Sequence, residues 1–202
     1  MTEVSRPTVP RRSDLLGARA DLVYASVARV LGLPGDIAEC GSNDGVTAVN
    51  MARIAAGQGV DKTVHAFDTF DGFPDVITDE EKSASEWPEL GPGLYPAAPT
   101  AVEWMQAQAP NIAVHRGLFS ETFPAFDRPL CFIHSDSDLY ISTVETIELA
   151  VRTLVPGGVI LFDDYGNPRL PGVQMAVDRC LDPGLFDGYR VQDAIQFTAR
   201  RR

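Results

Sequence analysis

The sequence predicts a single α/β domain with a doubly wound, mostly parallel sheet of seven strands and an antiparallel C-terminal edge strand. Three observations support this fold class. Short apolar runs alternate with segments of helical periodicity, which is typical of a parallel sheet covered by helices. The last two apolar runs are joined by a short link, which favours an antiparallel pair. The 202 residues show no internal repeat and no second composition regime, which indicates one core.

The composition limits the classes of function. A hydrophobic content of 45% is typical of a globular protein, and no apolar run approaches the roughly eighteen residues that span a bilayer. The net charge of −11 disfavours nucleic acid as the main partner, because phosphate groups require a basic face. The N-terminus has no apolar signal-peptide core, which predicts a cytoplasmic protein. Cys40, Cys131 and Cys180 lie far apart, so we expect buried thiols and neither a zinc site nor a disulfide.

The N-terminal part is expected to alternate between helix and strand. Residues 1–13 are expected to form a flexible arm, and residues 14–202 the domain. Helical spacing of apolar residues begins at Asp14, with Ser13 as the expected N-cap and the Asp14 carboxylate favoured by the helix dipole. The stretch 32–35, Gly-Leu-Pro-Gly, ends this helix. A strand at 36–40, a turn at 41–45, a helix at 46–56 and a strand at 64–67 are expected to follow.

The segment after the second strand differs from the rest of the chain. Residues 71–99 are rich in Pro, Gly, Asp and Glu, and they are too long for a plain connector. We expect a loop with some helix there, and a lid or acceptor-site insertion over residues 75–99. Regular elements then resume. The remaining expected helices are 101–108, 142–154 and 172–181, and the remaining expected strands are 112–116, 130–134, 159–162, 189–191 and 194–199.

The first candidate site is the turn at 41–45. A strand that leads through Gly41 and Gly45 into a helix brings backbone N–H groups close to a ligand at the helix N-terminus. The spacing is neither the dinucleotide fingerprint nor a Walker motif, which disfavours NAD and ATP. Asp68, at the end of the next strand, lies where an acid can bind ribose hydroxyls. The pattern favours a nucleoside-like ligand, and a tight turn that only needs glycine conformations is the alternative.

Carboxylates at two strand ends form the second candidate site. One apolar run ends before Asp136 and Asp138, and another ends at Asp163 and Asp164. Ligands bind at the carboxyl ends of the strands in open α/β sheets, and Mg²⁺ prefers hard oxygen ligands. Asp136, Asp163 and Asp164 are therefore the predicted metal ligands. Asp138 is assigned mainly to capping the next helix, a role that Ser142 could also take.

The predicted catalytic residues are Asp136 and His134. His134 lies close to the acids in the sequence and is a candidate general base. Asp138 and a water molecule remain open as alternatives for the base. His65 and His115 fall within strand patterns, where packing is the favoured role.

Five sequence blocks identify a family resemblance. They are Ile-Ala-Glu-Cys-Gly at 37–41, Phe-Asp-Thr-Phe-Asp-Gly-Phe-Pro at 67–74, Gly-Leu-Phe-Ser-Glu-Thr-Phe-Pro at 117–124, Asp-Ser-Asp-Leu-Tyr at 136–140 and Pro-Gly-Gly-Val-Ile-Leu-Phe-Asp-Asp-Tyr-Gly at 156–166. In this order they resemble the macrocin O-methyltransferase family. Its members are class I S-adenosylmethionine-dependent enzymes, many of which methylate sugar hydroxyls of natural products.

The resemblance implies a Rossmann-like class I methyltransferase fold that binds S-adenosylmethionine, with Mg²⁺ at the three predicted aspartates. Glu39, Gly41 and Thr47 would contact the methionine end of the cofactor, Asp68 the ribose hydroxyls, and Phe119 with Ser120 the adenine. Ser42, Gly45, Thr69, Gly117 and Asp136 complete the predicted cofactor-binding set.

The predicted activity is methyl transfer from S-adenosylmethionine to a hydroxyl of a small molecule, a sugar or phenol of a natural product, assisted by Mg²⁺. The chain is shorter at both ends than is usual for the family, so the insertion at 75–99 is expected to shape more of the acceptor site. A metal-independent N-methyltransferase and a non-catalytic S-adenosylmethionine-binding accessory protein are the alternatives. A homodimer is compatible with the sequence, although no stretch specifies an interface.

Overall fold

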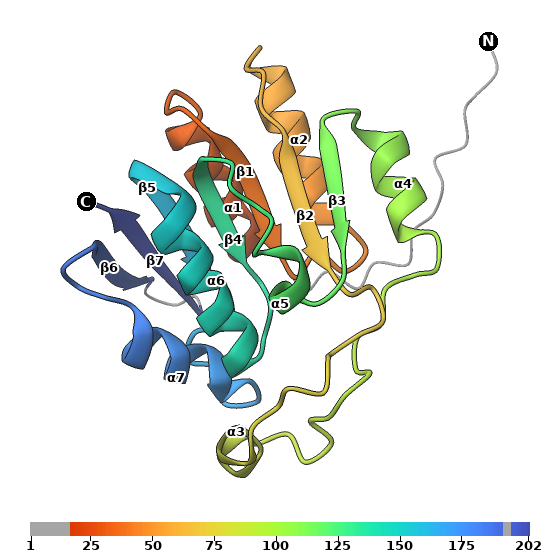
Figure 1. Ribbon diagram of the computed structural model, residues 1–202, viewed down its shortest axis with the longest axis vertical. Coiled ribbons are helices and arrows are strands. Elements are labelled where there is room, and N and C mark those ends of the chain that lie inside the picture. The colour runs from red at the N-terminus through yellow and green to blue at the C-terminus, as the bar shows by residue number, and fades with distance from the viewer. Residues whose placement is uncertain (1–16, 192–194) are drawn as a thin grey trace.

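The computed structural model describes residues 17–191 and 195–202, and its centre is one seven-stranded sheet (Figure 1). The strands are β1 Asp36–Cys40, β2 Val64–Asp68, β3 Ile112–Arg116, β4 Leu130–Ser135, β5 Leu154–Phe162, β6 Phe186–Val191 and β7 Gln196–Arg201. Their order in the sheet is β3-β2-β1-β4-β5-β7-β6. β1 to β5 pair in parallel, and β7 pairs antiparallel with β5 and β6. The predicted mostly parallel sheet is confirmed, with β6 at the edge beyond the antiparallel β7.

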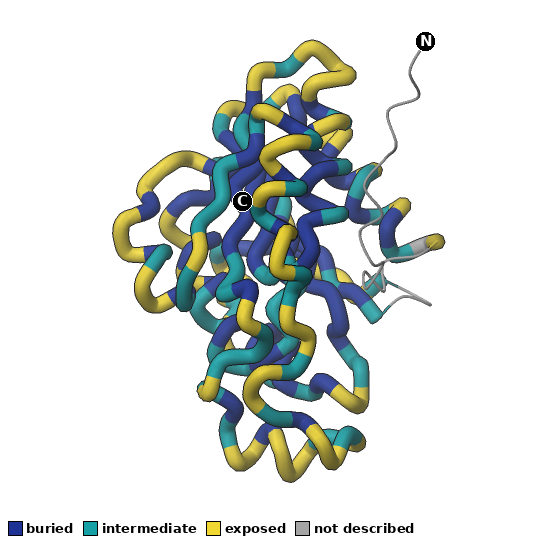
Figure 2. Tube along the Cα trace, turned by 90° about the vertical axis from the view of Figure 1, so that its right-hand side faces the viewer, coloured by how far each residue is buried: buried dark blue, intermediate teal, exposed yellow. Residues whose placement is uncertain are grey.

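Helices cover both faces of this sheet. They are α1 Ala18–Val30, α2 Val46–Gly57, α3 Asp79–Ala84, α4 Ala101–Gln108, α5 Phe119–Thr122, α6 Tyr140–Thr153 and α7 Pro171–Cys180. One hydrophobic cluster joins α1, α2 and α4 to one face, and a second joins α5, α6 and α7 to the other. β1 and β4 are buried along their whole length between these layers, and Figure 2 shows buried residues in the interior and exposed ones at the periphery. Burial on both faces explains why the parallel strands are continuous apolar runs.

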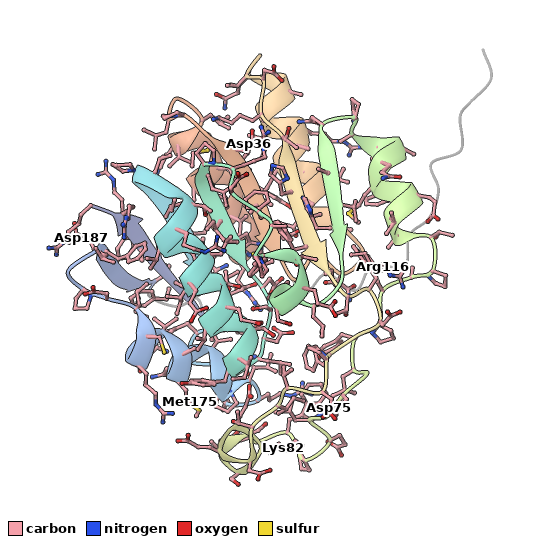
Figure 3. The ribbon with its side chains drawn as sticks, in the orientation of Figure 1. Asp36, Asp75, Lys82, Arg116, Met175 and Asp187 are labelled. Carbon is pink, nitrogen blue, oxygen red and sulfur yellow. The ribbon has the colours of Figure 1, made fainter. Side chains whose placement is uncertain are left out.

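The carboxyl ends of the parallel strands share one edge of the sheet, and the segment 71–99 extends beyond that edge (Figure 1). Figure 3 shows Asp75 and Lys82 of this segment at that end of the molecule, while Asp36, at the start of β1, lies at the other end. A third, smaller hydrophobic cluster connects the segment with the starts of α6 and α7. Its buried members are Ile77, Leu90, Leu139 and Leu170.

Several element boundaries differ from the prediction. α1 begins at Ala18 and not at residue 14, because Gly17 has a φ of 71°, outside the helical region. The expected cap, Ser13, and the expected flexible arm, residues 1–13, lie outside the described residues. α6 begins at Tyr140, two residues earlier than expected. β5 begins at Leu154 and not at the expected residue 159, because Leu154 already pairs with Leu130 of β4 ahead of a shift in register.

Two further expectations were incomplete or wrong. α5 was not predicted, because four residues are too few to show a helical period. The thiols of Cys40 and Cys131 are buried as expected, but Cys180 is exposed at the last residue of α7. Residue 194, the expected start of the final strand, lies outside the described residues, and β7 begins at Gln196.

Candidate active site

A cavity of about 310 Å³ lies at the carboxyl edge of the sheet, between the strand ends and the segment 71–99. This size falls within the usual range for small-molecule sites. It is lined by most of the predicted site residues: Glu39, Gly41, Ser42, Gly45, Thr47, Asp68, Thr69, Phe119, Ser120, Asp136, Asp163 and Asp164. Gly117 and His134 are not among the described residues that line it. The two candidate sites of the sequence are therefore parts of one cavity.

The turn after β1 requires glycine at both of its predicted positions. Gly41 and Gly45 have φ angles of 90° and 78°. A Cβ on Gly41 would collide with the carbonyl oxygen of Asp136, and one on Gly45 with the side chain of Met105. Tight-turn geometry thus explains both glycines, and the same geometry leaves the backbone at the start of α2 open to the cavity.

Asp68 is held at the end of β2 by backbone groups. Its Oδ2 accepts the N–H of Asn43 at 2.8 Å, and its Oδ1 accepts the N–H of Phe70 at 2.6 Å. Burial raises the pKa of Asp68, and these two N–H groups only partly oppose that effect. The N–H of Gly117 donates to the carbonyl of Asp68 at 3.0 Å, so Gly117 supports this residue from behind the cavity. Each carboxylate oxygen retains a lone pair for a ligand hydroxyl.

His134 lies beneath the cavity and pairs with Glu39. Its Nδ1 is 3.0 Å from Oε1 of Glu39, and both side chains are buried. Burial would lower the pKa of His134, but the hydrogen bond to Glu39 and the charges of Asp136 and Asp163 raise it to about 9. A histidine that is protonated at neutral pH cannot accept a proton, so this geometry disfavours His134 as the general base. It fits a residue that orients Glu39.

Three carboxylates meet in this cavity just beyond the ends of β4 and β5. Asp136, Asp138 and Asp164 each offer an oxygen, and these atoms all lie within 4.8 Å of one another. Burial raises the pKa of all three carboxyls, and repulsion by neighbouring carboxylates raises it further. Mg²⁺ binds hard oxygens at about 2.1 Å, which places its ligand atoms about 3–4 Å apart. The oxygen donors and their mutual repulsion therefore fit a divalent cation.

This group corrects the predicted role of Asp138. The N-cap of α6 is Leu139, so neither Asp138 nor Ser142 occupies the capping position. Asp138 and Asp164 have φ angles of 63° and 57°, in the left-handed region that non-glycine residues seldom adopt. Such conformations are concentrated at functional sites, and here they bring both carboxylates to Asp136. The sequence signal for Asp138 was its position two residues after Asp136.

Asp163 differs from the other acids because an arginine neutralises it. Nε of Arg19 donates to Asp163 Oδ1 at 3.0 Å, and Arg19 Nη2 lies 2.6 Å from Asp163 Oδ2. Asp163 also belongs to a second group that could hold a metal ion, with His134 and Asp136. No sequence pattern pointed to Arg19, which is 144 residues away from Asp163.

The segment 71–99 supplies an aromatic wall to the cavity. Phe73, Trp87 and Tyr95 line it, with Tyr95 5.4 Å from Phe73 and 5.6 Å from Trp87 between ring centroids. The guanidinium of Arg169, from the loop before α7, stacks on Trp87 at 4.4 Å. These residues were missed individually, although the length and composition of the segment had indicated a role at the site.

Comparison with known proteins gives the family. The family model for macrocin O-methyltransferase (TylF) matches residues 16–182, most of the chain. The chain belongs to the macrocin O-methyltransferase family. The resemblance stated from the five sequence blocks is thereby confirmed.

Two similar proteins are O-methyltransferases by name. The 8-demethyl-8-(2,3-dimethoxy-alpha-L-rhamnosyl)-tetracenomycin-C 4'-O-methyltransferase of Streptomyces olivaceus is 29% identical over 175 residues, which cover 81% of this chain and 62% of the relative. The mycinamicin III 3''-O-methyltransferase of Micromonospora griseorubida is 29% identical over 150 residues, 68% of this chain and 58% of the relative. The chain therefore spans about six-tenths of the length of these relatives.

Solved structures agree on the fold. The O-methyltransferase NovP superposes with a TM-score of 0.76 at 23% identity, covering 91% of this chain and 79% of its own. The chain thus has the predicted Rossmann-like class I methyltransferase fold. No helix among residues 17–191 and 195–202 is long and apolar enough to cross a membrane.

Proposed function

We propose that the chain is an S-adenosylmethionine-dependent O-methyltransferase that methylates a sugar hydroxyl of a natural product, with Mg²⁺ as a cofactor. The main support for the proposal is that the glycine turn, Asp68 and the acid cluster line the same cavity. Both relatives are O-methyltransferases by name, and the name of the first includes a rhamnosyl group, which supports the choice of a sugar hydroxyl over a phenol.

The residues fit each proposed ligand. The turn at 41–45 would hold the methionine end of the cofactor and Asp68 its ribose, because Asp68 keeps acceptor capacity beyond its two backbone partners. Phe119 and Ser120, at the start of α5, would border the adenine. Asp136, Asp163 and Asp164, the predicted ligands, would hold the metal, with the Asp138 carboxylate beside them. When bound, S-adenosylmethionine supplies an electrophilic methyl group, and Mg²⁺ supplies Lewis acidity at the acceptor hydroxyl.

Asp136 is the residue that connects the two halves of the site. Its N–H donates to the carbonyl of Cys40 at 2.8 Å, which ties the acid cluster to the strand that leads into Gly41. An acceptor hydroxyl beside the Asp136 carboxylate would face the cofactor turn. Asp136 would thereby orient the acceptor oxygen toward the methyl group of S-adenosylmethionine. We assign the uptake of the hydroxyl proton to a carboxylate oxygen of Asp136. His134, already protonated, would hold Glu39 at the cofactor end.

The segment 75–99 would act as the lid of this site. On the cofactor side, the Asn43 side-chain amide donates to the backbone carbonyl of Tyr95 at 2.7 Å, and the Ala98 N–H donates to Asp44 Oδ1 at 2.7 Å. On the other side, Glu86 N–H donates to the carbonyl of Pro168 at 2.9 Å. A lid attached on both sides excludes water from the transfer and presents its aromatic wall to the acceptor.

The test is transfer of a labelled methyl group from S-adenosylmethionine to a panel of acceptors: glycosylated natural products, free phenols and amines. Label on a sugar hydroxyl is the expected result. Label only on an amine would favour an N-methyltransferase, and cofactor binding with no transfer would favour an accessory protein. Either result would refute the proposal.

A further inference from the structure

Asn43, in the turn after β1, contacts both the proposed ribose ligand and the lid. Its backbone N–H donates to Asp68 Oδ2 at 2.8 Å, and its side-chain Nδ2 donates to the carbonyl of Tyr95 at 2.7 Å. Its Oδ1 accepts the N–H of Asp44 at 2.8 Å. Asn43, Asp68 and Tyr95 all line the cavity. One side chain therefore joins the cofactor half of the cavity to the segment that carries the aromatic wall.

The backbone conformation of this residue does not by itself account for an asparagine. Asn43 has a φ of 45°, in the left-handed region that glycine adopts most easily and asparagine tolerates. The backbone N–H that reaches Asp68 would also be present in a glycine. The side chain of Asn43 is therefore needed only for its two further partners, the Asp44 N–H and the Tyr95 carbonyl.

Tyr95 has an equally uncommon backbone conformation. Its φ is 56°, which is rare for an aromatic residue and indicates that its surroundings constrain it. In this conformation its carbonyl accepts the bond from Asn43, and its ring centroid lies 5.4 Å from that of Phe73 and 5.6 Å from that of Trp87. The bond from Asn43 therefore fixes the backbone of the residue that contacts both other members of the aromatic wall.

Two further bonds attach the same end of the lid to the cofactor side. The Ala98 N–H donates to Asp44 Oδ1 at 2.7 Å, and the Ala97 N–H donates to the carbonyl of Phe70 at 3.3 Å. Asp44 is buried, whereas the bond between Asn43 and Tyr95 is exposed to solvent at the wall of the cavity. A hydrogen bond is stronger where the local dielectric constant is low, so a ligand that displaces water beside this bond would strengthen it.

We propose that Asn43 is a positioning residue that connects cofactor binding to the aromatic wall of the acceptor site. S-adenosylmethionine on Asp68 and the turn at 41–45 would shield the bond from Asn43 to Tyr95, and that bond would hold the aromatic wall in place for the acceptor. The inference rests on the proposed function, which assigns the cofactor to the turn and the acceptor to the lid. A side chain that only stabilises the turn would affect cofactor binding and leave the lid unchanged.

Two variants separate the role of the side chain from that of the backbone. Asn43→Gly keeps the left-handed conformation and the N–H to Asp68, but it removes both side-chain bonds. Asn43→Asp keeps an acceptor for the Asp44 N–H and places an oxygen opposite the Tyr95 carbonyl, where the two oxygens repel each other. Asn43→Asp is therefore expected to have the larger effect on the lid.

Asn111→Ala is the matched control. The side-chain Nδ2 of Asn111 also donates to backbone carbonyls, those of Ala52 and Lys62 at 3.2 Å and 3.1 Å. Asn111 is not among the described residues that line the cavity. This variant should lower the unfolding temperature without an effect on the lid or on the acceptor.

Limited proteolysis within 75–99, on the full chain with and without S-adenosylhomocysteine, measures the link between cofactor and lid. The ligand should slow cleavage in the wild type and in Asn111→Ala. In both Asn43 variants its protective effect should be smaller by roughly two- to twelvefold, as expected for the loss of a neutral hydrogen bond. The affinity for S-adenosylhomocysteine should fall by no more than the same factor, because cofactor and lid must affect each other equally.

Kinetics at saturating S-adenosylmethionine provide the second readout. The KM for a glycosylated acceptor should rise by a similar factor in both Asn43 variants, while kcat stays close to the wild-type value. A role confined to the turn would not raise this KM, because the cofactor is saturating. Proteolysis needs no acceptor, so it tests the role of Asn43 independently of methyl transfer.

The outcomes separate the inference from the proposed function. Wild-type protection of the lid in both Asn43 variants, with an unchanged acceptor KM, overturns the inference and leaves the proposed function standing. Loss of S-adenosylhomocysteine binding in both variants would show that the side chain acts on the cofactor itself, and would also overturn it. A wild type that does not bind S-adenosylhomocysteine overturns the proposed function and the inference together. Reduced protection of the lid with a raised acceptor KM supports both.

Discussion

Replacing Glu81 with alanine is expected to release the lid from the starts of α6 and α7. Glu81, on α3, is completely buried, and its Oε1 accepts the N–H of Tyr140, the first residue of α6, at 2.9 Å. It also lies so close to Gly172, near the start of α7, that a Cβ on Gly172 would collide with it. A carboxylate between two helix N-termini is favoured by both dipoles, and here it comes from the lid.

The magnitude follows from what alanine removes. The N-cap of α6, Leu139, makes no side-chain capping bond, so Glu81 is the residue that caps this helix within the described chain. Loss of a cap costs about 0.5–2 kcal/mol, and a buried N–H without a partner costs about 1–3 kcal/mol. A combined cost of about 2 kcal/mol would shift the docking equilibrium of the lid roughly thirtyfold toward the open state.

Hydrogen exchange at the Tyr140 amide and limited proteolysis within 75–99 measure this opening. Glu81→Ala should exchange and be cleaved faster, and Glu81→Gln should change less because its amide oxygen can still accept the Tyr140 N–H. Glu80→Gln is the control on the same helix: it removes an exposed ion pair with Arg179 and should leave both rates close to wild type. Equal rates for Glu81→Ala and Glu80→Gln would refute the proposed attachment of the lid.

Three further predictions concern single carboxyls. Asp68→Asn should weaken binding of S-adenosylmethionine by about ten- to a hundredfold in calorimetry, because a charged hydrogen-bond acceptor is lost; unchanged affinity would remove Asp68 from the cofactor site. Asp138→Asn should weaken Mg²⁺ binding yet raise the unfolding temperature in EDTA, because it relieves repulsion by Asp164 and Asp136; a lower unfolding temperature with intact Mg²⁺ binding would instead indicate a structural role. Burial would raise the pKa of Asp36, but hydrogen bonds from the Thr63 N–H and Arg128 lower it below its ordinary value of 3.8. A carboxyl whose pKa is lowered by folding stabilises the folded state above its unfolded-state pKa, and this stabilisation is lost in acid. The free energy of unfolding should therefore fall below about pH 4, and it should fall less steeply in Asp36→Asn. Identical acid unfolding of the wild type and Asp36→Asn would contradict this prediction.

The sequence predicts the parts of this site that depend on topology. Strand ends in a parallel sheet converge, so the turn at 41–45, Asp68 and the acids after β4 and β5 were expected at one edge. The predicted capping role of Asp138 was wrong. Its φ of 63° turns its carboxylate toward the other acids, and no local sequence pattern predicts a left-handed aspartate. Arg19 and Glu81 were missed for a different reason. Each reaches the site across the fold, and such contacts follow from packing and not from spacing along the chain.

In the proposed function, the acid cluster and the cofactor turn form one metal-assisted methyl-transfer site. The most direct measurement is methyl transfer to a glycosylated acceptor in EDTA and after addition of excess Mg²⁺, with S-adenosylmethionine binding measured in the same samples. Transfer should stop in EDTA and return with Mg²⁺, while cofactor binding persists throughout, because the contacts assigned to Asp68 and the turn at 41–45 do not require the metal. Full transfer in EDTA would contradict the account.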